Sequence, residues 1–171
     1  MFTITTERPA DAGEIEALLD VAFGAGRLAK ASYQYRHGVR PIAGLSLVAR
    51  DGDRLVGAIR YWPVRIGNAA TPALLLGPLA VDPTRRGEGI GRMLVARTLD
   101  RAMLDGQRIV LLVGDLAYYR QFGFEPAAPH GLIMPREKPA RLLVRTLAPD
   151  ALAGITGDIR PARRARVSRA A

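Results

Sequence analysis

The residues best suited to chemistry form a glycine-rich turn between an apolar segment and a helix. The turn reads Arg86-Gly87-Glu88-Gly89-Ile90-Gly91-Arg92. Because glycine has no Cβ, the backbone N–H groups of such a turn can approach an anion closely, and the dipole of the following helix adds partial positive charge. Guanidinium groups match the geometry of phosphate oxygens. The turn therefore predicts a binding site for a phosphate-bearing ligand.

Two common phosphate-binding motifs do not fit this spacing. A P-loop requires Gly-x-x-x-x-Gly-Lys-Ser/Thr, whereas Gly91 is followed by Arg92 and Met93. The dinucleotide-binding fingerprint requires Gly-x-Gly-x-x-Gly, and if Gly87 and Gly89 are its first two glycines, Arg92 occupies the third position. The turn therefore belongs to another class of phosphate-binding sequence.

The spacing that does fit is Gln/Arg-x-x-Gly-x-Gly/Ala, and residues 86–91 thereby resemble the pyrophosphate-binding motif of the GNAT acetyltransferases. Two flanking segments strengthen the resemblance. Residues 79–83 (LAVDP) are similar to the family's fourth strand, and residues 119–124 (YRQFGF) match its Tyr-x-x-x-Gly-Phe segment. The resemblance covers residues 2–147. The doublet Tyr118-Tyr119 and residues 147–157 further resemble a bacterial subgroup whose substrates are largely unassigned.

The resemblance implies an activity and a set of ligand contacts. It implies direct transfer of an acetyl group from acetyl-CoA to a primary amine of a small-molecule or peptide acceptor, and it leaves a homodimer open. It places the strand around Leu79, Ala80 and Val81 along the pantetheine arm, with an amide near Leu79 polarising the thioester carbonyl. The residues implied in pyrophosphate binding are Arg86, Gly87, Glu88, Gly89, Ile90, Gly91 and Arg92.

Tyr119 matches the tyrosine that protonates the departing thiolate in many members of the family. A phenol with a pKa of about 10 is protonated at neutral pH and can serve as a general acid. We therefore expect Tyr119 to be catalytic, with its neighbour Tyr118 as the alternative. An aromatic residue in a short amphipathic helix can also serve only as core.

The sequence does not identify the general base. An acceptor amine must lose a proton before it attacks, usually to a carboxylate or through water. Residues 73–81 contain no acidic residue, and the candidates by type alone are Glu14, Asp20, Asp82 and Asp115. The histidines, His37 and His130, have no ligand-like spacing, so we expect no metal site.

Two other functions compete with acetyl transfer. The missing acidic residue on the fourth strand is compatible with a domain that binds acyl-CoA without catalysis. The formal net charge of +9 raises the possibility of a nucleic-acid partner. Five arginines of the last dozen residues carry much of this charge, and no nucleic-acid-binding motif accompanies them, so we do not expect nucleic acid to bind.

The pattern along the chain agrees in order with the GNAT fold. This is an α/β fold whose central mixed, mostly antiparallel twisted sheet of six to seven strands is flanked by helices and splayed between strands four and five. Apolar alternation or continuous apolar runs predict strands at 2–7, 45–50, 54–66, 73–81, 108–113 and 141–147. Turn residues 51–53 predict a hairpin, and Gly77-Pro78 predicts a bulge or splay.

Helices are predicted from Asp11, over residues 89–104 and over residues 116–122. Asp11 and Glu14 have the spacing of a capping box at the start of the first helix. Residues 24–44 are compatible with either helix or loop. The core positions expected on the first two helices are Ile15, Leu18, Leu19, Ala22 and Phe23, and then Gly91, Leu94, Val95, Thr98, Leu99, Ala102 and Met103.

Length and composition indicate one globular domain, because 171 residues with 49% hydrophobic and 24% charged residues are ordinary for such a domain. We expect the acetyltransferase domain to span residues 1–147 and residues 148–171 to form a short extension with a basic, flexible tail, which is dispensable for acetyl transfer after Gly157. The chain has no cysteine, which excludes disulfides and a cysteine acyl-enzyme. The start resembles no signal peptide and no long apolar run occurs, so we expect a cytoplasmic protein without a membrane partner.

Overall fold

The computed structural model describes residues 1–162 of the chain, and the part of the predicted tail from residue 163 onward lies outside the described residues. The strands are β1 (Thr3–Thr6), β2 (Leu47–Asp51), β3 (Arg54–Ile66), β4 (Thr71–Val81), β5 (Ile109–Val113), β6 (Glu125–Pro126), β7 (Leu132–Ile133), β8 (Leu142–Thr146) and β9 (Gly157–Pro161). The α-helices are α1 (Ala12–Phe23), α2 (Ile90–Leu104) and α3 (Leu116–Tyr119).

Short 3₁₀ segments connect these elements. The segment that the sequence left open between helix and loop forms η2 (Ala25–Ala29), η3 (Ala31–Arg36) and η4 (Ala43–Leu45). The others are η1 (Pro9–Asp11), η5 (Pro83–Arg85), η6 (Arg120–Phe122), η7 (Ala128–His130) and η8 (Pro139–Arg141).

The sheet is mixed and mostly antiparallel, as predicted. Its main path runs β1-β2-β3-β4-β5-β8-β6, and only the β4–β5 pair on this path is parallel. The expected hairpin of β2 and β3 is confirmed, with Asp51 opposite Arg54. Residues 1–162 contain nine strands where six to seven were expected, because β6, β7 and β9 are short segments whose two to five residues carry little strand pattern.

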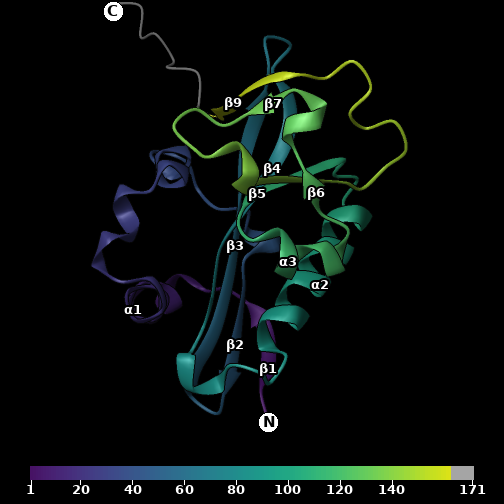
Figure 1. Ribbon diagram of the computed structural model, residues 1–171. Coiled ribbons are helices and arrows are strands. Elements are labelled where there is room, and N and C mark those ends of the chain that lie inside the picture. Colours follow the sequence, from purple (N-terminus) through teal and green to yellow (C-terminus); the bar gives the residue numbers. More distant parts are fainter. Residues whose placement is uncertain (163–171) are drawn as a thin grey trace, which may run out of the picture.

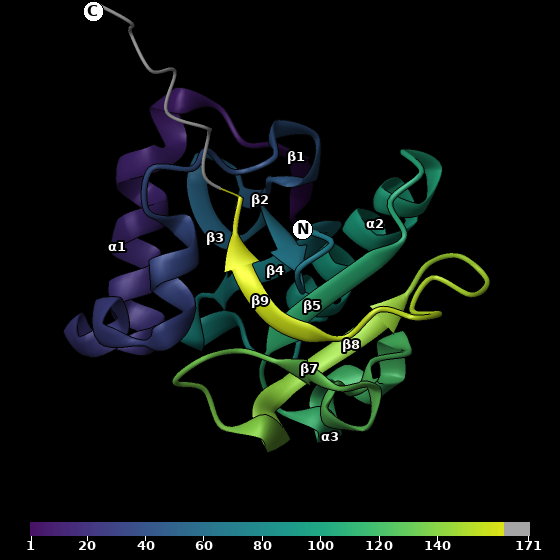
Figure 2. The ribbon, with the colours of Figure 1, turned by 90° about the horizontal axis from the view of Figure 1, so that it is seen from above.

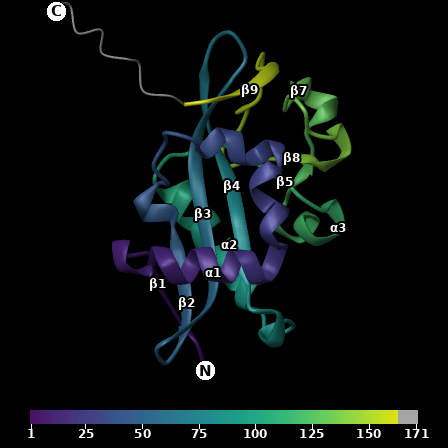
Figure 3. The same cartoon turned by 90° about the vertical axis from the view of Figure 1, so that its left-hand side faces the viewer.

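The two long helices cover opposite faces of the sheet, with α1 in front of the strands and α2 behind them in Figure 3, and on opposite sides in the view from above (Figure 2). On the α1 face, Ile15, Leu18 and Leu19 pack against buried residues of β2, β3 and β4. On the α2 face, the buried residues are Ile90, Leu94, Val95, Thr98, Leu99 and Ala102. Both predicted stripes therefore meet the sheet.

Two residues predicted in these stripes are not core. Phe23 is 43% exposed at the end of α1, and Met103 is 46% exposed near the end of α2. Each lies in the last turn of its helix, and in α2 the neighbouring Ala102 is the residue of that turn that faces the sheet.

The predicted capping box at the start of α1 is also wrong. Asp11 precedes the first residue of the helix, but its carboxylate accepts a hydrogen bond from the backbone N–H of Arg8, at 2.7 Å. Glu14 instead binds the guanidinium of Arg50 on β2, with a shortest distance of 2.6 Å. The arginine from a neighbouring strand outcompetes the local cap.

The prediction that the last strand ends near Leu147 is wrong, because β9 adds to the sheet beyond it. Residues 159–161 pair antiparallel with Ile66, Arg65 and Val64 of β3, and Ile159 is buried. β9 also pairs with β7, and both lie at the top of Figure 1. Residues 158–161 therefore belong to the fold and not to a flexible tail, while their dispensability for acetyl transfer stays a prediction.

The predicted splay lies between β4 and β5. Leu74, Leu75 and Leu76 pair with residues 110–112 of β5, and this pairing stops at Gly77. On the other side, β4 stays paired with β3 down to Val81 after a register shift between Ile59 and Tyr61. The edge of residues 77–81 that faces β5 consequently has no strand partner within the described chain.

Candidate active site

The open edge of β4 carries three of the predicted cofactor-binding residues. Leu79, Ala80 and Val81 lie opposite Ile59, Ala58 and Gly57 on the β3 side. On their other side the splay leaves main-chain N–H and C=O groups without a β5 partner. Since an unpaired strand edge is a template for another extended chain, it can pair with a linear ligand that contains amides.

The glycine-rich turn follows directly and leads into α2. Gly87 and Gly89 have φ of +90° and +79°, which L-residues with side chains rarely adopt. A Cβ built on either residue would meet no atom within 4 Å, so the space beside the turn is open. Gly89 is the residue that caps α2, and the first amides of that helix have no intrahelical partner. The geometry suits a phosphate group.

Two of the arginines in this region have no carboxylate partner in the described part of the chain. Neither Arg86 nor Arg92 makes an ion pair within residues 1–162. Arg85, in contrast, binds both Glu88, at 2.5 Å, and Asp51, at 2.7 Å. Glu88 therefore fixes Arg85, while Arg86 and Arg92 are available for an anion.

A cavity of about 430 Å³ joins these features. Its walls are the open strand, the turn, the first residues of α2, the last residues of α1 and Tyr118. Of the predicted cofactor-binding residues, Leu79, Ala80, Val81, Arg86, Gly87, Gly89, Ile90, Gly91 and Arg92 line it, and Glu88 does not. The structure thus brings together nearly the whole predicted set.

A second cavity of about 780 Å³ lies where β4 and β5 separate. Residues of η2 and η3, the splayed part of β4, the start of α3 and the loop before β8 line it. The two cavities share Phe23, Leu79 and Tyr118, so they meet where β4 leaves β5. Phe23, whose exposure contradicted the core prediction, is a wall residue at this junction.

The tyrosine doublet stands at the same place, because α3 starts immediately after β5. Gly114 allows this approach, since a Cβ on it would lie only 2.6 Å from Cε2 of Tyr119. Tyr119 packs against Phe124, with ring centroids 5.8 Å apart, and lines only the larger cavity. Tyr118 lines both cavities, and a Cβ on Gly91 would lie 3.0 Å from its hydroxyl.

Both phenols are available as proton donors. Neither hydroxyl has a hydrogen-bond partner among the described residues. Burial raises the pKa of Tyr119 well above its usual value and also raises that of Tyr118, with the charges of Arg141 and Arg92, respectively, opposing the shift. Each phenol therefore stays protonated over the neutral range.

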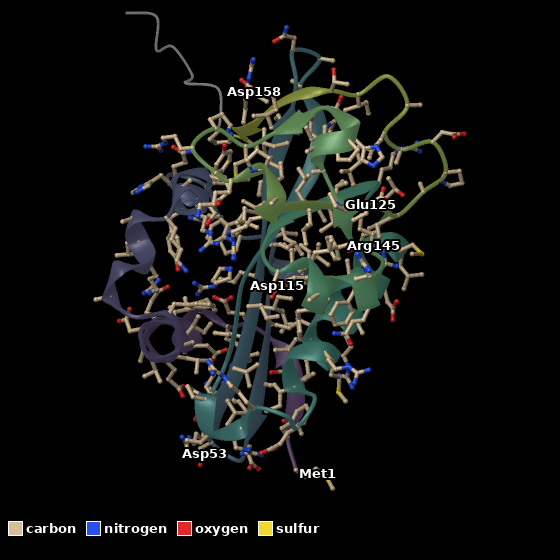
Figure 4. All side chains as sticks on the ribbon, viewed as in Figure 1. Met1, Asp53, Asp115, Glu125, Arg145 and Asp158 are labelled. Atoms are coloured by element: carbon tan, nitrogen blue, oxygen red, sulfur yellow. The ribbon has the colours of Figure 1, made fainter. Side chains whose placement is uncertain are left out.

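Of the carboxylates considered as a base, only Asp115 lines the larger cavity. It caps α3 by accepting a hydrogen bond from the N–H of Ala117, and Figure 4 shows it near the middle of the molecule. Glu14, Asp20 and Asp82 are engaged elsewhere, by Arg50, Arg27 and Arg54 respectively. Sequence reasoning missed Glu137, which also lines the cavity and accepts a hydrogen bond from the N–H of Lys138.

Neither histidine lines either of the two cavities. His37 is exposed, and His130 binds Glu125 at 2.8 Å. In the part of the chain that the structure covers, no group of three or more His, Cys, Asp or Glu side chains could hold a metal ion. None of the helices within residues 1–162 is long and apolar enough to cross a membrane.

Sequence reasoning also missed Arg36, the last residue of η3. Its guanidinium lies over the ring of Tyr33, 4.1 Å from the centroid, and faces the larger cavity beside Gly77. The only signal in the sequence was the presence of aromatic and charged residues in a segment without clear periodicity, which gives no direction for any side chain.

Comparison with known proteins agrees with this architecture. The acetyltransferase (GNAT) domain family matches residues 4–127. The chain is 38% identical over 157 residues to the uncharacterized N-acetyltransferase YhbS of Escherichia coli K12, covering 90% of this chain and 92% of YhbS. The crystal structure of E. coli YhbS in complex with CoA has a TM-score of 0.80 and 36% identity, covering 92% of this chain and 88% of that chain.

A second solved structure is also similar. It is a GNAT family acetyltransferase from Brucella melitensis in complex with acetyl-CoA, with a TM-score of 0.70 and 31% identity. The similarity covers 94% of this chain and 95% of that chain. Both relatives therefore share the fold over nearly its whole length.

Proposed function

This chain belongs to the GNAT acetyltransferase family, and we propose that it transfers an acetyl group from acetyl-CoA directly to a primary amine. The observation that carries the proposal is the junction of two cavities at the splay of β4. The smaller cavity, which we call the cofactor cavity, has the glycine turn and two arginines unpaired within residues 1–162, Arg86 and Arg92, that suit a pyrophosphate. The larger one, which we call the acceptor cavity, has room for an acceptor. Leu79 and Tyr118 line both, so the reacting groups would meet there.

The residues present fit acetyl-CoA as the co-substrate. In the proposed complex, Arg86, Arg92 and the amides of Gly87, Gly89, Ile90 and Gly91 hold the pyrophosphate. On the open edge, main-chain groups of Leu79 and Val81 pair with the amides of the pantetheine arm, and Ala80 between them faces β3 with its own main-chain groups. Glu88 acts only by holding Arg85. CoA and acetyl-CoA in the complexes of the two structural neighbours support this assignment.

Acetyl-CoA supplies a thioester whose carbonyl carbon an amine can attack, with CoA thiolate as the leaving group. The amide of Leu79 lies on the open edge and would polarise the thioester carbonyl, as an oxyanion-hole donor does. Tyr119 would give its proton to the thiolate, because its phenol is protonated and free of hydrogen bonds to residues 1–162. The proton that the attacking amine loses would pass to a carboxylate or to water. Tyr118 would form the wall between the cofactor and acceptor cavities.

The absence of cysteine makes a direct test simple. A thiol reagent detects only the CoA that is released, because the protein contributes no thiol. Purified protein, acetyl-CoA and pools of primary amines should release CoA in an amine-dependent way, and mass spectrometry should show the N-acetylated product. If CoA is never released above the rate without protein across broad amine pools, the proposed transfer is wrong.

A second candidate function is an acyl-CoA-binding module without catalysis. It is favoured by the lack of an acidic residue on β4, since Asp115 and Glu137 are the only carboxylates that line the acceptor cavity in the described chain. The two functions separate in the same experiment, because a binding module would retain acetyl-CoA affinity while releasing no CoA.

A further inference from the structure

The acceptor cavity contains a partly buried guanidinium that no carboxylate of residues 1–162 neutralises. Arg36 makes no ion pair with any carboxylate of residues 1–162, and its Nε is buried without a hydrogen-bond partner. Burying a charge without a partner is costly. Such an arrangement is expected where a ligand supplies the missing partner.

Aromatic residues hold this guanidinium in place. Its central carbon lies 4.1 Å from the ring centroid of Tyr33 and 5.8 Å from that of Trp62. Tyr33 is fixed in turn, because its hydroxyl accepts a hydrogen bond from Arg27 at 2.9 Å, and Arg27 is paired with Glu16 and Asp20. Arg36 is therefore pre-organised rather than free to turn towards solvent.

The position of Arg36 places its nitrogen atoms next to the splay. Its Nη2 would lie 3.5 Å from a Cβ built on Gly77, the residue at which β4 separates from β5. Leu79, whose amide we assign to the thioester carbonyl, is two residues further along the same strand. A group bound by Arg36 would thus be held in the cavity close to the reacting end of the cofactor.

The remaining charges of this cavity are also mainly positive. The cationic side chains that line it are Arg27, Lys30, Arg36, Lys138 and Arg141, and the anionic ones are Asp115 and Glu137. Arg27 is neutralised by its own carboxylates, and Lys30 lies over the ring of Phe23, at 5.1 Å. A net positive cavity disfavours polyamines and other polycationic acceptors, because like charges repel.

From these observations we propose that the acceptor amine carries a carboxylate or phosphate group, and that Arg36 binds this anion in the acceptor cavity. This inference rests on the proposed acetyl transfer and names its substrate class. The planar fork of an arginine suits bidentate binding of either anion. Arg36 is then a specificity residue that positions the amine for attack.

The protonation of Arg36 is compatible with this role. Burial lowers its pKa to about 10, and the positive charges of Arg60 and Arg27 act in the same direction, while Tyr33 opposes them. The guanidinium therefore remains protonated at neutral pH. A bound anion would stabilise the charged form and remove part of the cost of burial.

The first test compares matched acceptors that differ in the anion. The pairs are L-alanine with L-alaninamide for the carboxylate, and phosphoethanolamine with ethanolamine for the phosphate. In at least one pair, the anionic acceptor should have a kcat/KM about tenfold higher than its neutral partner, as expected for hydrogen bonds to a charged group. The pair that shows this difference identifies whether the anion is a carboxylate or a phosphate.

Variants show whether this preference depends on Arg36. In Arg36→Gln, the kcat/KM of the anionic acceptor should exceed that of its neutral partner by less than about threefold. Arg36→Lys should retain part of the native preference. Arg40→Gln is the matched control, because Arg40 is exposed on the same segment and lies outside the cavity wall. Comparing ratios between variants cancels the intrinsic difference in reactivity between the two amines of a pair.

The second test measures anion binding without catalysis. Trp62 is the only tryptophan and lies beside Arg36, so its fluorescence reports on this site. Titration with succinate or inorganic phosphate at constant ionic strength should give a saturable change in the native protein and in Arg40→Gln, but not in Arg36→Gln. Arg36→Gln should fold like the native protein, because the change leaves no carboxylate unpaired. Thermal unfolding of the variant checks this.

The possible outcomes separate the two proposals. Preference for neutral or polycationic amines, an anion preference that persists in Arg36→Gln, or the absence of any saturable anion signal would overturn the role of Arg36. Acetyl transfer could still stand in each case. Saturable anion binding that depends on Arg36, in a protein that neither binds acetyl-CoA nor releases CoA, would support the anion site and contradict the proposed acetyl transfer.

Discussion

Tyr118 and Tyr119 are adjacent in sequence, yet their side chains have different surroundings. The ring of Tyr119 packs on Gly114 and Phe124, so its hydroxyl is held within the larger cavity. Tyr118 lies against Gly91 and Arg92, on the side where the pyrophosphate would bind. The match to the family's Tyr-x-x-x-Gly-Phe segment favours Tyr119 as the acid, and Tyr118, which lines both cavities, is the alternative.

The variant Tyr119→Phe should lower kcat by about 10²-fold while leaving acetyl-CoA affinity unchanged, because only the proton donor is lost and the ring still packs. Tyr118→Phe is the matched control and should retain most of kcat. Steady-state kinetics and calorimetry measure the two quantities. A loss of kcat confined to Tyr118→Phe would exchange the two roles, and full activity of both variants would exclude a phenolic acid.

The same assignment predicts a pH dependence. A general acid works only while protonated, and burial raises the pKa of Tyr119 above the ordinary tyrosine value of about 10. The kcat of the native protein should therefore show no decrease caused by loss of this proton up to pH 9. A decrease with an apparent pKa near 8 that disappears in Tyr119→Phe would contradict the assignment.

At the level of elements, the start of α1 is tied to the sheet through Asp11. Its buried carboxylate binds the backbone N–H of Arg8 and, at 3.0 Å, the guanidinium of Arg50 on β2. The hydrogen bond from the backbone of Arg8 is the main reason that the pKa of Asp11 falls to about 2, despite opposing burial, and the two arginines lower it further. Local sequence suggested an ordinary cap, whereas one partner of Asp11 is the neighbouring Arg8 and the other comes from a strand far along the chain.

A depressed carboxylate pKa stabilises the fold above the pKa of the unfolded chain, about 3.9, and this contribution is lost as pH falls through the folded value of about 2. Asp11→Asn should therefore be less stable than the native protein at pH 6, and the difference should shrink between pH 4 and pH 2. Urea denaturation at each pH measures it. The exposed Asp100→Asn is the control, and an equal difference for Asp11→Asn at all pH values would contradict the explanation.

The segment that positions Arg36 depends on β9. The hydroxyl of Tyr35, which is buried, donates a hydrogen bond to the carbonyl oxygen of Ile159, at 3.2 Å. Tyr35→Phe should lower the free energy of unfolding by about 1 kcal/mol through loss of this bond. It should also weaken the anion signal of Trp62 while leaving acetyl-CoA affinity unchanged. No change in either stability or anion binding would show that β9 does not support η3.

Sequence reasoning succeeded where local pattern and spacing decide the structure. The sequence predicted the strands with alternating or apolar runs, the hairpin, the splay and the glycine turn. Each of these features depends on residues that are close together in the sequence. Sequence reasoning failed where distant residues decide, as for the pairing of β9 with β3 and the binding of Glu14 by Arg50. Arg36 was missed for the same reason, since the pairing of β4 and the side chains of Tyr33 and Trp62 determine where its guanidinium lies.

For the whole molecule, β9 links the C-terminal segment to the same sheet that forms the cofactor site (Figure 1). Truncation after Gly157 removes Ile159, and exposing the surface that it covers should cost about 2 kcal/mol or more. The midpoint of thermal unfolding should therefore fall by several degrees. Truncation after Ala162 is the matched control, because it keeps all of β9. Equal midpoints for the two truncated proteins would contradict a structural role for β9.

The measurement that tests the central claim most directly is calorimetric titration of acetyl-CoA into the native protein and two variants of Gly89. Native protein should bind with a dissociation constant in the micromolar range. Gly89→Asp should abolish binding by placing negative charge beside the pyrophosphate, whereas Gly89→Asn, of similar shape and with a better tolerance of positive φ, should bind more weakly than native but measurably. Absence of heat with the native protein, or equal affinity of all three proteins, would contradict the claim that this turn binds acetyl-CoA.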